Sequence, residues 1–515
     1  MPSIILLPPQ SLVMAVSSPP YQYEVAIIGA GFSGLAMAAR LQEAGQRSFV
    51  ILERANEVGG TWRDNTYPGC ACDIMSHLYS FSFAPNPHWS RMYPQQPEIL
   101  AYLKRFTDHY SLRQHLRLGT SLLAAHFEQD GGYWKLQAAD GQIFTARTVV
   151  AALGPLNRPH YPDIPGLADF QGEVFHSAKW NHTYDLEGKR IAVIGTGASA
   201  IQFVPQIAPK VSALHLFQRS APWIMPKPDR AVRAWEQRLF RRFPLTQRLL
   251  RHAIYWANEL RGLLFMGNKT IQQWGQKKAL KYLQKSVSDP ELRQKLTPDY
   301  AIGCKRILIS NDYYPALQLP QVQVHTEGIE RITADAVCTK AGERLAVDAI
   351  ILGTGFVAAD FVVDMKIRGL DGQNLFDEWL RTGAQAYKGA TVSGYPNWLF
   401  LVGPNTGGGH NSIVHIAESQ VAYAMSYLEY LRQQPNGAYL DLKAEAQAAY
   451  NVELQQKMQQ TVWLSGCKSW YLNQAGQNTT LYPGLNYQFR QITAKFDNQA
   501  YTLKTNTQTT LATIG

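Results

Sequence analysis

An apolar strand followed directly by a glycine-rich turn occurs twice in this 515-residue chain, and this repeat constrains the fold more than any other feature. The first turn reads GAGFSG at residues 29–34, after the apolar residues 24–28 and before a helical pattern. Such glycines let the backbone approach a pyrophosphate, which the amides of the following helix bind. The next apolar strand, residues 49–52, ends at Glu53, an acceptor for a ribose diol. A turn without a ligand is the alternative, but the whole pattern predicts a dinucleotide-binding unit.

The second turn reads GTGASA at residues 195–200, after the strand residues 191–194. Alanine replaces the third glycine, which the fingerprint allows. The residue 24 positions after the first glycine is Glu53 in the first copy and Arg219, next to Ser220, in the second. An acid repels a 2′-phosphate and an arginine binds it, so the first unit suits FAD or NAD and the second suits NADP. A solvated charge at a strand end is the alternative interpretation of Arg219.

Two different dinucleotides in one chain predict a redox relay in which NADPH donates a hydride to a bound flavin. The formal net charge of +10 favours anionic partners, and cofactor phosphates satisfy that preference. We expect no nucleic-acid partner, because no basic run is long enough to suggest one. Hydrophobic residues make up 46% of the chain, which excludes wholesale disorder.

The expected fold class is α/β, with two Rossmann-like dinucleotide-binding domains and a helical insert. Apolar strands that meet a glycine at residues 148–153 and again at 347–352 indicate twin crossings between the domains. We therefore expect the NADP domain to be inserted into a discontinuous FAD domain. The expected boundaries are a flexible tail at 1–20, an FAD domain at 21–155 and 346–515, and an NADP domain at 156–345 with the helical insert at 228–300.

The helical insert is rich in arginine and carries aromatic residues such as Trp235. An ordinary helical subdomain with a solvated basic face is the interpretation we favour. A weak contact with a membrane surface is the alternative, because amphipathic basic helices bind there. The pattern does not indicate an oligomeric state.

The five cysteines show no zinc spacing and imply neither a metal site nor a disulfide framework. No apolar stretch reaches the ~18 residues of a membrane-spanning helix. The apolar residues 4–7 lack a preceding cation and run into two prolines, so they make a poor signal peptide. We therefore expect a cytoplasmic protein.

The stretch FQGEVFHSAKW at residues 170–180 matches the pattern FxGxxxHxxxW, which resembles the fingerprint of Baeyer–Villiger monooxygenases. The pattern GGTW at 59–62 and YPG at 67–69, followed by Asp73, is similar to a second motif of these class B flavin monooxygenases. The resemblance covers about residues 21–490. Trp180 favours ketone oxidation, because relatives that oxidise amines and sulfides carry another aromatic there. Asn181 departs from the usual proline or aspartate.

The resemblance implies roles for single residues. Arg306 is expected to be the catalytic arginine, which stabilises a flavin C4a-peroxide anion and the adduct with the ketone, and Asp73 orients it. Lys305 is expected to help hold the NADP 2′-phosphate, and Trp470 to close a mobile loop over the nucleotide. His176 is read as structural and not as a general base. The resemblance also places the glycine-rich stretch 403–411 beside the flavin.

These inferences give one candidate site. Arg306 and Asp73 are the expected catalytic residues. The expected cofactor-binding residues are Gly29, Gly31, Ser33, Gly34, Glu53, Thr61, Trp62, Asp73, Tyr79, Leu122, Gly195, Thr196, Gly197, Ser199, Arg219, Ser220, Lys305 and Trp470.

The expected reaction inserts one atom of molecular oxygen beside a ketone carbonyl and gives an ester or lactone, with FAD and NADP as cofactors. Three alternatives remain. A related monooxygenase oxidises sulfur or nitrogen. A flavin disulfide reductase needs a dithiol, for which Cys70 and Cys72 have unsuitable spacing. An idle nucleotide-binding or membrane-surface protein would not need these intact motifs.

Overall fold

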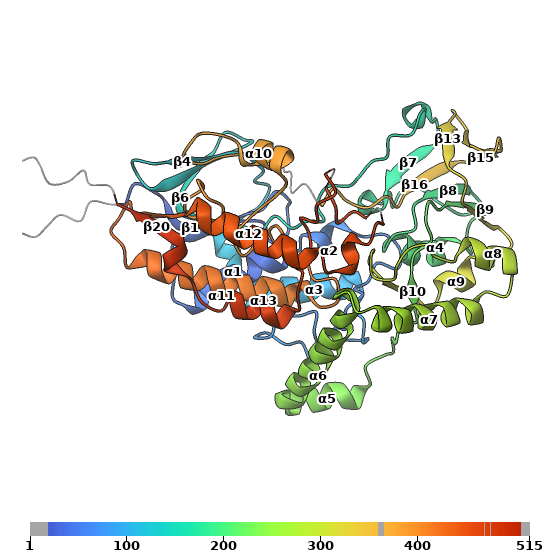
Figure 1. The fold of residues 1–515 in the computed structure, drawn as a ribbon, viewed down its shortest axis with the longest axis horizontal. Helices are drawn as coiled ribbons and strands as arrows, with labels where there is room; N and C mark the ends of the chain where they lie inside the picture. The colour runs from blue at the N-terminus through green and yellow to red at the C-terminus, as the bar shows by residue number, and fades with distance from the viewer. Residues whose placement is uncertain (1–18, 359–364, 468, 474, 506–515) are drawn as a thin grey trace, which may run out of the picture.

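Two separate sheets, one for each glycine-rich turn, organise the fold (Figure 1). The computed structural model describes residues 19–358, 365–467, 469–473 and 475–505. Most of the tail expected at 1–20, and the last ten residues of the expected FAD domain, therefore lie outside the described residues. Among the described residues, no helix combines the length and apolar character needed to cross a bilayer.

The first sheet has eight strands in the order β17-β4-β5-β6-β1-β2-β3, with β18 also paired to β6. Strands β1, β2, β6 and β18 run parallel, whereas β4, β5 and β6 form an antiparallel meander. Residues 26–28 and 49–52 are buried because α1 packs with α11 beside this sheet, so these strands read as continuous apolar runs. The strands are β1 Tyr23–Ile28, β2 Phe49–Leu52, β3 Leu116–Arg117, β4 Leu122–Glu128, β5 Tyr133–Ala138, β6 Ile143–Ala151, β17 Lys366–Arg368 and β18 Trp398–Phe400.

The second sheet has five parallel strands in the order β12-β9-β8-β16-β7. It lies beside the first sheet, at the right of Figure 1. Its strands are β7 Glu173–His176, β8 Arg190–Ile194, β9 Ala213–Phe217, β12 Val322–His325 and β16 Ala349–Leu352. Smaller sheets join β10 Ile224–Met225 to β11 Leu308–Ile309, β13 Ile329–Ile332 to β14 Ala336–Thr339 and β15 Arg344–Ala346, and β19 Tyr439–Leu442 to β20 Tyr501–Lys504.

The second sheet interrupts the first along the chain, as expected of an inserted domain. The boundary expected at residue 346 is wrong, however. Strand β16 pairs with β7 and β8, so residues 349–352 still belong to the second sheet. The chain rejoins the first sheet at β17, which pairs with β4. The apolar run 347–352 was misassigned because a buried central strand looks the same in either sheet.

The helices complete the two domains and the insert. Pro244 begins α6 and Gly262 ends it, so the sequence breaks expected in the insert lie at helix ends. Helices α5 and α6 protrude below the body in Figure 1. The helices are α1 Phe32–Glu43, α2 Thr61–Asp64, α3 Gln96–His109, α4 Ala200–Ile207, α5 Ala234–Arg242, α6 Pro244–Gly262, α7 Lys269–Ser286, α8 Pro290–Lys295, α9 Tyr313–Ala316, α10 Leu375–Thr382, α11 Ile413–Arg432, α12 Ala444–Met458 and α13 Asn486–Ile492.

Candidate active site

The first glycine-rich turn joins β1 to α1 and leaves a bare cradle. Gly29 has φ +102°, and a Cβ there would lie 2.6 Å from the carbonyl oxygen of Ala152. A Cβ on Gly60 would lie 3.1 Å from the Cα of Gly31, so two stretches of backbone meet without side chains between them. Helix α1 has no side-chain cap at its N-terminus and no acid in its first turn. Its free amides therefore fit a cofactor pyrophosphate.

Glu53 directly follows β2 and is only 4% exposed. One carboxylate oxygen accepts a 2.8 Å hydrogen bond from the Ala30 amide. The other accepts a 3.0 Å bond from Arg63. Three covalently separate segments thus fix the acceptor expected for a ribose. Ser33 and Gly34 lie in the first turn of α1, which begins directly after the cradle.

The second turn joins β8 to α4 and repeats the geometry. Gly195 has φ +104°, and a Cβ there would lie 2.5 Å from the carbonyl oxygen of Gly353. Helix α4 begins directly after Gly197, Ala198 and Ser199, again without a side-chain cap or an acid in its first turn. This second cradle fits a second pyrophosphate.

A basic cluster lies where β9 ends. The Lys305 ammonium donates a 2.6 Å hydrogen bond to the Ser220 hydroxyl, and the Thr196 hydroxyl lies 3.5 Å from the Ser220 carbonyl oxygen. Arg219 is exposed. Burial and then the charge of Arg219 lower the pKa of Lys305, which places the two cations close together. An anion between them relieves this repulsion, so the cluster fits a 2′-phosphate.

Arg306 and Asp73 form an ion pair between the two halves of the molecule. The Nη2 and Nε atoms of Arg306 lie 2.6 and 2.7 Å from one carboxylate oxygen of Asp73. The two side chains are 28% and 29% exposed. The charge of Asp73 raises the pKa of Arg306, so the guanidinium keeps its proton at any working pH. The arginine therefore offers a permanent, oriented positive charge.

The segment that carries Asp73 is held against the second domain. The Tyr67 hydroxyl donates a 3.0 Å bond to the side-chain oxygen of Gln202 on α4, and the Gln202 amide donates a 2.9 Å bond to the Ala71 carbonyl. The Trp62 indole, beside Thr61 at the start of α2, donates a 3.0 Å bond to the Tyr79 hydroxyl. Sequence patterns gave no signal for Gln202, because its role depends on how the domains meet.

The C-terminal loop approaches Arg306 from another side. Tyr471, which sequence analysis missed, is 2% exposed and interacts with Arg306. Burial raises the pKa of Tyr471 to about 12. Its neighbour Trp470 is 43% exposed and packs on the Tyr471 ring. Trp470 therefore lies at the surface next to the ion pair and is not a core residue.

A disulfide joins this loop to the catalytic segment, contrary to expectation. Cys304, adjacent to Lys305, is bonded to Cys467, and their Cα atoms are 6.3 Å apart. The two cysteines are 163 positions apart in sequence, so their proximity has no local signature. Cys70 and Cys72 are free and buried, so the structure offers no dithiol of the kind that a disulfide reductase uses.

Two histidines sit in structural settings. His176 ends β7, is 1% exposed and accepts a 3.0 Å hydrogen bond from the Ala178 amide. Burial lowers the pKa of His176 to about 4, so its ring is neutral at pH 7. The stretch 403–411 is fixed by α6, where Glu259 accepts a 2.5 Å bond from Asn411 and lies 3.3 Å from His410.

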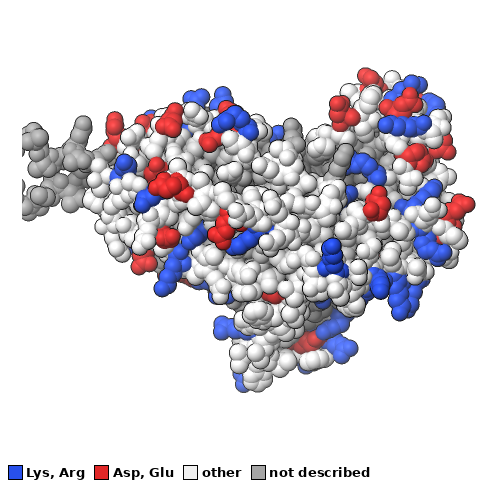
Figure 2. Space-filling view, in the orientation of Figure 1, with Lys and Arg blue, Asp and Glu red and all other residues white. Residues whose placement is uncertain are grey.

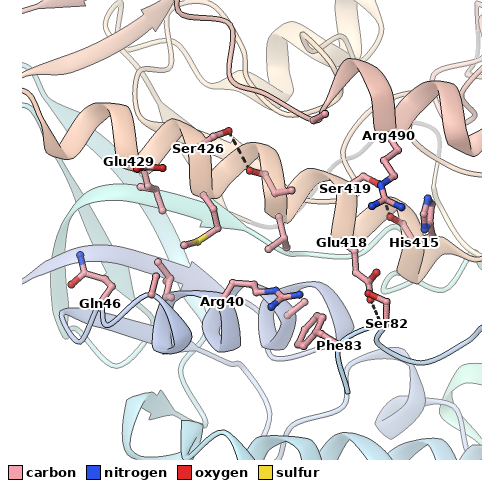
Figure 3. A pocket seen from close by; sticks show the side chains of 18 of the residues that line it. Arg40, Gln46, Ser82, Phe83, His415, Glu418, Ser419, Ser426, Glu429 and Arg490 are labelled. Carbon is pink, nitrogen blue, oxygen red and sulfur yellow. Dashed lines mark hydrogen bonds between the residues drawn. The ribbon is translucent and has the colours of Figure 1, made fainter. Parts of the chain in front are cut away.

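Leu122 and the largest groove stand apart from these contacts. Leu122, the first residue of β4, packs on the apolar core of the first sheet. The groove, of about 1260 Å³, is lined by α1, α6, α11 and α13, and none of the expected site residues lines it. Figure 3 shows Arg40 of α1 and Glu418 of α11 at this groove, with Glu418 bonded to the Ser82 amide. Its size alone therefore does not mark it as the catalytic centre.

Known proteins share this architecture. A family model described as "Pyridine nucleotide-disulphide oxidoreductase" matches residues 26–253, which include both glycine-rich turns. A Baeyer–Villiger monooxygenase of Pseudomonas aeruginosa is 50% identical over 484 residues, covering 94% of this chain and 92% of that protein. The structure of cyclohexanone monooxygenase from Rhodococcus sp. Phi1 bound to NADP+ matches with a TM-score of 0.83 and 26% identity, covering 95% of this chain and 100% of the other. OTEMO in complex with FAD and NADP matches with a TM-score of 0.83 and 25% identity, covering 95% and 100%.

The paired cradles and their differing strand ends define a flavoprotein oxidoreductase with two dinucleotide sites. More narrowly, the chain belongs to the Baeyer–Villiger monooxygenase family, because half of its residues are identical to such an enzyme over nearly the whole length of both. It is therefore an FAD- and NADP-dependent monooxygenase.

Proposed function

We propose that this enzyme uses NADPH and molecular oxygen to convert an apolar ketone into an ester or lactone, and that Arg306 and Asp73 are its catalytic pair. The ion pair carries the proposal, because it places a permanent cation between the two nucleotide cradles. One oxygen atom enters the product and the other leaves as water, while NADPH supplies two electrons. FAD, when bound, supplies the oxygen-activating chemistry.

The residues of this chain divide the remaining work. Arg306 stabilises the negative charge that develops on oxygen as the ketone carbonyl is attacked. Asp73 holds the guanidinium in place through the same two nitrogens. Arg219, Ser220 and Lys305 hold the 2′-phosphate, which distinguishes NADPH from NADH.

Water exclusion is the proposed task of the loop that carries Trp470 and Tyr471. Tyr471 is already packed beside Arg306, whereas Trp470 is exposed. Closure of Trp470 over the bound nucleotide would dry the site and strengthen the charge interactions inside it.

An isotope experiment tests the proposal. The holoenzyme is given NADPH, labelled molecular oxygen and an apolar cyclic ketone, and the product is identified by mass spectrometry. A lactone that carries one labelled atom supports the proposal. A thioether run in parallel tests the heteroatom alternative: a sulfoxide without any lactone would overturn ketone oxidation. NADPH consumption with only hydrogen peroxide formed would overturn both.

We also propose that the enzyme works in the cytoplasm, which the buried free thiols of Cys70 and Cys72 support. A reducing compartment keeps thiols open. Cys304 and Cys467 are therefore expected as thiols in the cell and as a disulfide after purification without reductant. Alkylation with a mass tag in freshly lysed cells measures this, and a disulfide found in the cell would contradict the placement.

A further inference from the structure

Helix α6 presents an apolar stripe to solvent. Leu245, Leu249, Trp256 and Leu260 follow one another at spacings of four, seven and four residues, which places them on one face of the helix. These side chains are 65%, 60%, 52% and 67% exposed. Single exposed apolar residues are ordinary on a protein surface, but a contiguous row marks an interaction site.

The elements on either side extend the stripe with aromatic rings. Trp235 on α5 is 53% exposed, Phe243 between α5 and α6 is 57% exposed, and Trp274 on α7 is 64% exposed. Tryptophan is favoured at the boundary between lipid headgroups and acyl chains, because its ring is apolar and its indole nitrogen is polar.

Every exposed charge of residues 234–286 is positive. The two acids of this segment, Glu236 and Glu259, are 8% and 2% exposed. Figure 2 shows the protruding lobe as white surface with blue at its margins. The exposed cations are Arg238, Arg241, Arg242, Arg248, Arg261, Lys269, Lys277, Lys278, Lys281 and Lys285. We call the exposed side chains of α5, α6 and α7 the basic apolar face.

The helix that carries the stripe is rigidly anchored on its inner side. Arg251 donates hydrogen bonds of 2.9–3.0 Å to the carbonyls of His77, Leu78 and Ser80. Hydrogen bonds from Asn411 and His410 outweigh the effect of burial and lower the pKa of Glu259, so this carboxylate stays ionised and holds the other end of α6. The stripe is thus held outward by a fixed helix.

We propose that the basic apolar face docks this enzyme on a membrane surface that contains anionic lipid. Apolar side chains enter the interface while the surrounding cations meet lipid phosphates, and each contribution reinforces the other. A second copy of the chain fits less well as the occupant, because a two-fold interface would bring cations against cations.

Vesicle sedimentation of the FAD-loaded, full-length enzyme tests the proposal. Vesicles of phosphatidylcholine are compared with vesicles that contain about one-third phosphatidylglycerol, where anionic lipid adds about fivefold in binding for each cation engaged. We expect binding to the anionic vesicles only, and a loss of that binding as salt shortens the range of the charge interaction.

Two double variants separate the contributions. L249S with W256S should weaken binding to anionic vesicles by about tenfold or more, because buried apolar area is lost. R241Q with R242Q should weaken it by about tenfold or more through charge. Matched controls are L123S with I143S, whose side chains are 49% and 52% exposed elsewhere, and K366Q with R368Q on β17. The controls should bind as the unchanged protein does, and all variants should retain FAD and turnover of a water-soluble ketone.

Three results would overturn the proposal. The first is no sedimentation with anionic vesicles. The second is equal binding by L249S with W256S and by the unchanged enzyme. The third is a dimer in analytical ultracentrifugation that L249S with W256S dissociates while vesicles never bind, which would make the face an interface between copies. Vesicle binding needs no turnover, so this test is independent of the ketone assay.

Discussion

The two dinucleotide cradles share one backbone geometry and differ at the strand end that follows. Gly29 and Gly195 have φ values of +102° and +104°, and each packs against a backbone carbonyl of a neighbouring strand end. The acceptor in the first cradle, Glu53, is buried and fixed by two donors. The cation in the second cradle, Arg219, is exposed. A buried, oriented acceptor suits a cofactor that stays bound, whereas an exposed cation suits a nucleotide that enters and leaves.

Replacing the residue that joins the two cradles should have the largest effect. Arg306→Met removes the cation that stabilises charge on the reacting oxygen, and we expect ester formation to fall by about 10²–10³-fold. NADPH oxidation should continue and release hydrogen peroxide, because both cradles remain intact. Product analysis and peroxide detection in the same reaction measure the split.

Two companion variants guard that interpretation. Arg306→Met leaves the Asp73 carboxylate without its cation, so the double variant with Asp73→Asn separates lost catalysis from a stranded charge. Arg306→Lys keeps a charge but not the paired contacts of Nη2 and Nε. Ester formation by Arg306→Met at the unchanged rate would remove this residue from the mechanism.

Opening the disulfide should have the next largest effect, on stability. The Cys304–Cys467 bond closes a long loop and ties the second domain to the C-terminal loop. Cross-links of this kind typically add about 2–4 kcal/mol. Cys467→Ser should therefore lower the denaturant midpoint in oxidising buffer and make it insensitive to reductant. Cys338→Ser, at a free thiol, is the matched control. Identical midpoints with and without reductant in the unchanged protein would show that the bond does not stabilise the fold.

Local pattern carried much of the fold and less of the site. Both cradles follow from turn chemistry and strand periodicity, and the helix boundaries at Pro244 and Gly262 follow from local breaks. Local sequence could not assign β16, because a buried parallel strand has the same composition in either sheet. It also could not find Gln202, Tyr471 or the disulfide, whose partners are far away in sequence. The Asp73–Arg306 pair was expected only through family resemblance, since 233 positions separate its members.

Exchanging the strand-end charge should reverse coenzyme preference. Arg219→Glu replaces an attractive contact to the 2′-phosphate with a repulsive one, and a charged hydrogen bond is worth about 1.5–3 kcal/mol. We expect KM for NADPH to rise by about 10–100-fold and KM for NADH to fall. The reciprocal variant Glu53→Gln should reduce FAD retention during dialysis and leave the preference for NADPH unchanged. If Arg219→Glu left both KM values unchanged, Arg219 would be only a solvated surface charge.

A buried histidine of the second domain should give the smallest effect, visible only in acid. Burial lowers the pKa of His176 to about 4, below the value of about 6.5 in the unfolded chain. Between these values the unfolded chain binds the extra proton, so stability falls as pH drops from 6.5 toward 4. At pH 5.5 this costs about 1.4 kcal/mol. His176→Asn keeps an acceptor for the Ala178 amide but does not titrate.

The loss of melting temperature between pH 8 and pH 5.5 should therefore be smaller in His176→Asn, by about 1–3 °C, while the two proteins melt alike at pH 8. The comparison with the first domain sharpens this test. Burial also lowers the pKa of His415 on α11 to about 4, so His415→Asn should reduce the acid loss in the same direction. Equal acid sensitivity in all three proteins would mean that neither ring is held neutral by the fold. Catalytic activity at pH 8 should survive in His176→Asn, because a neutral, buried imidazole takes no part in proton transfer.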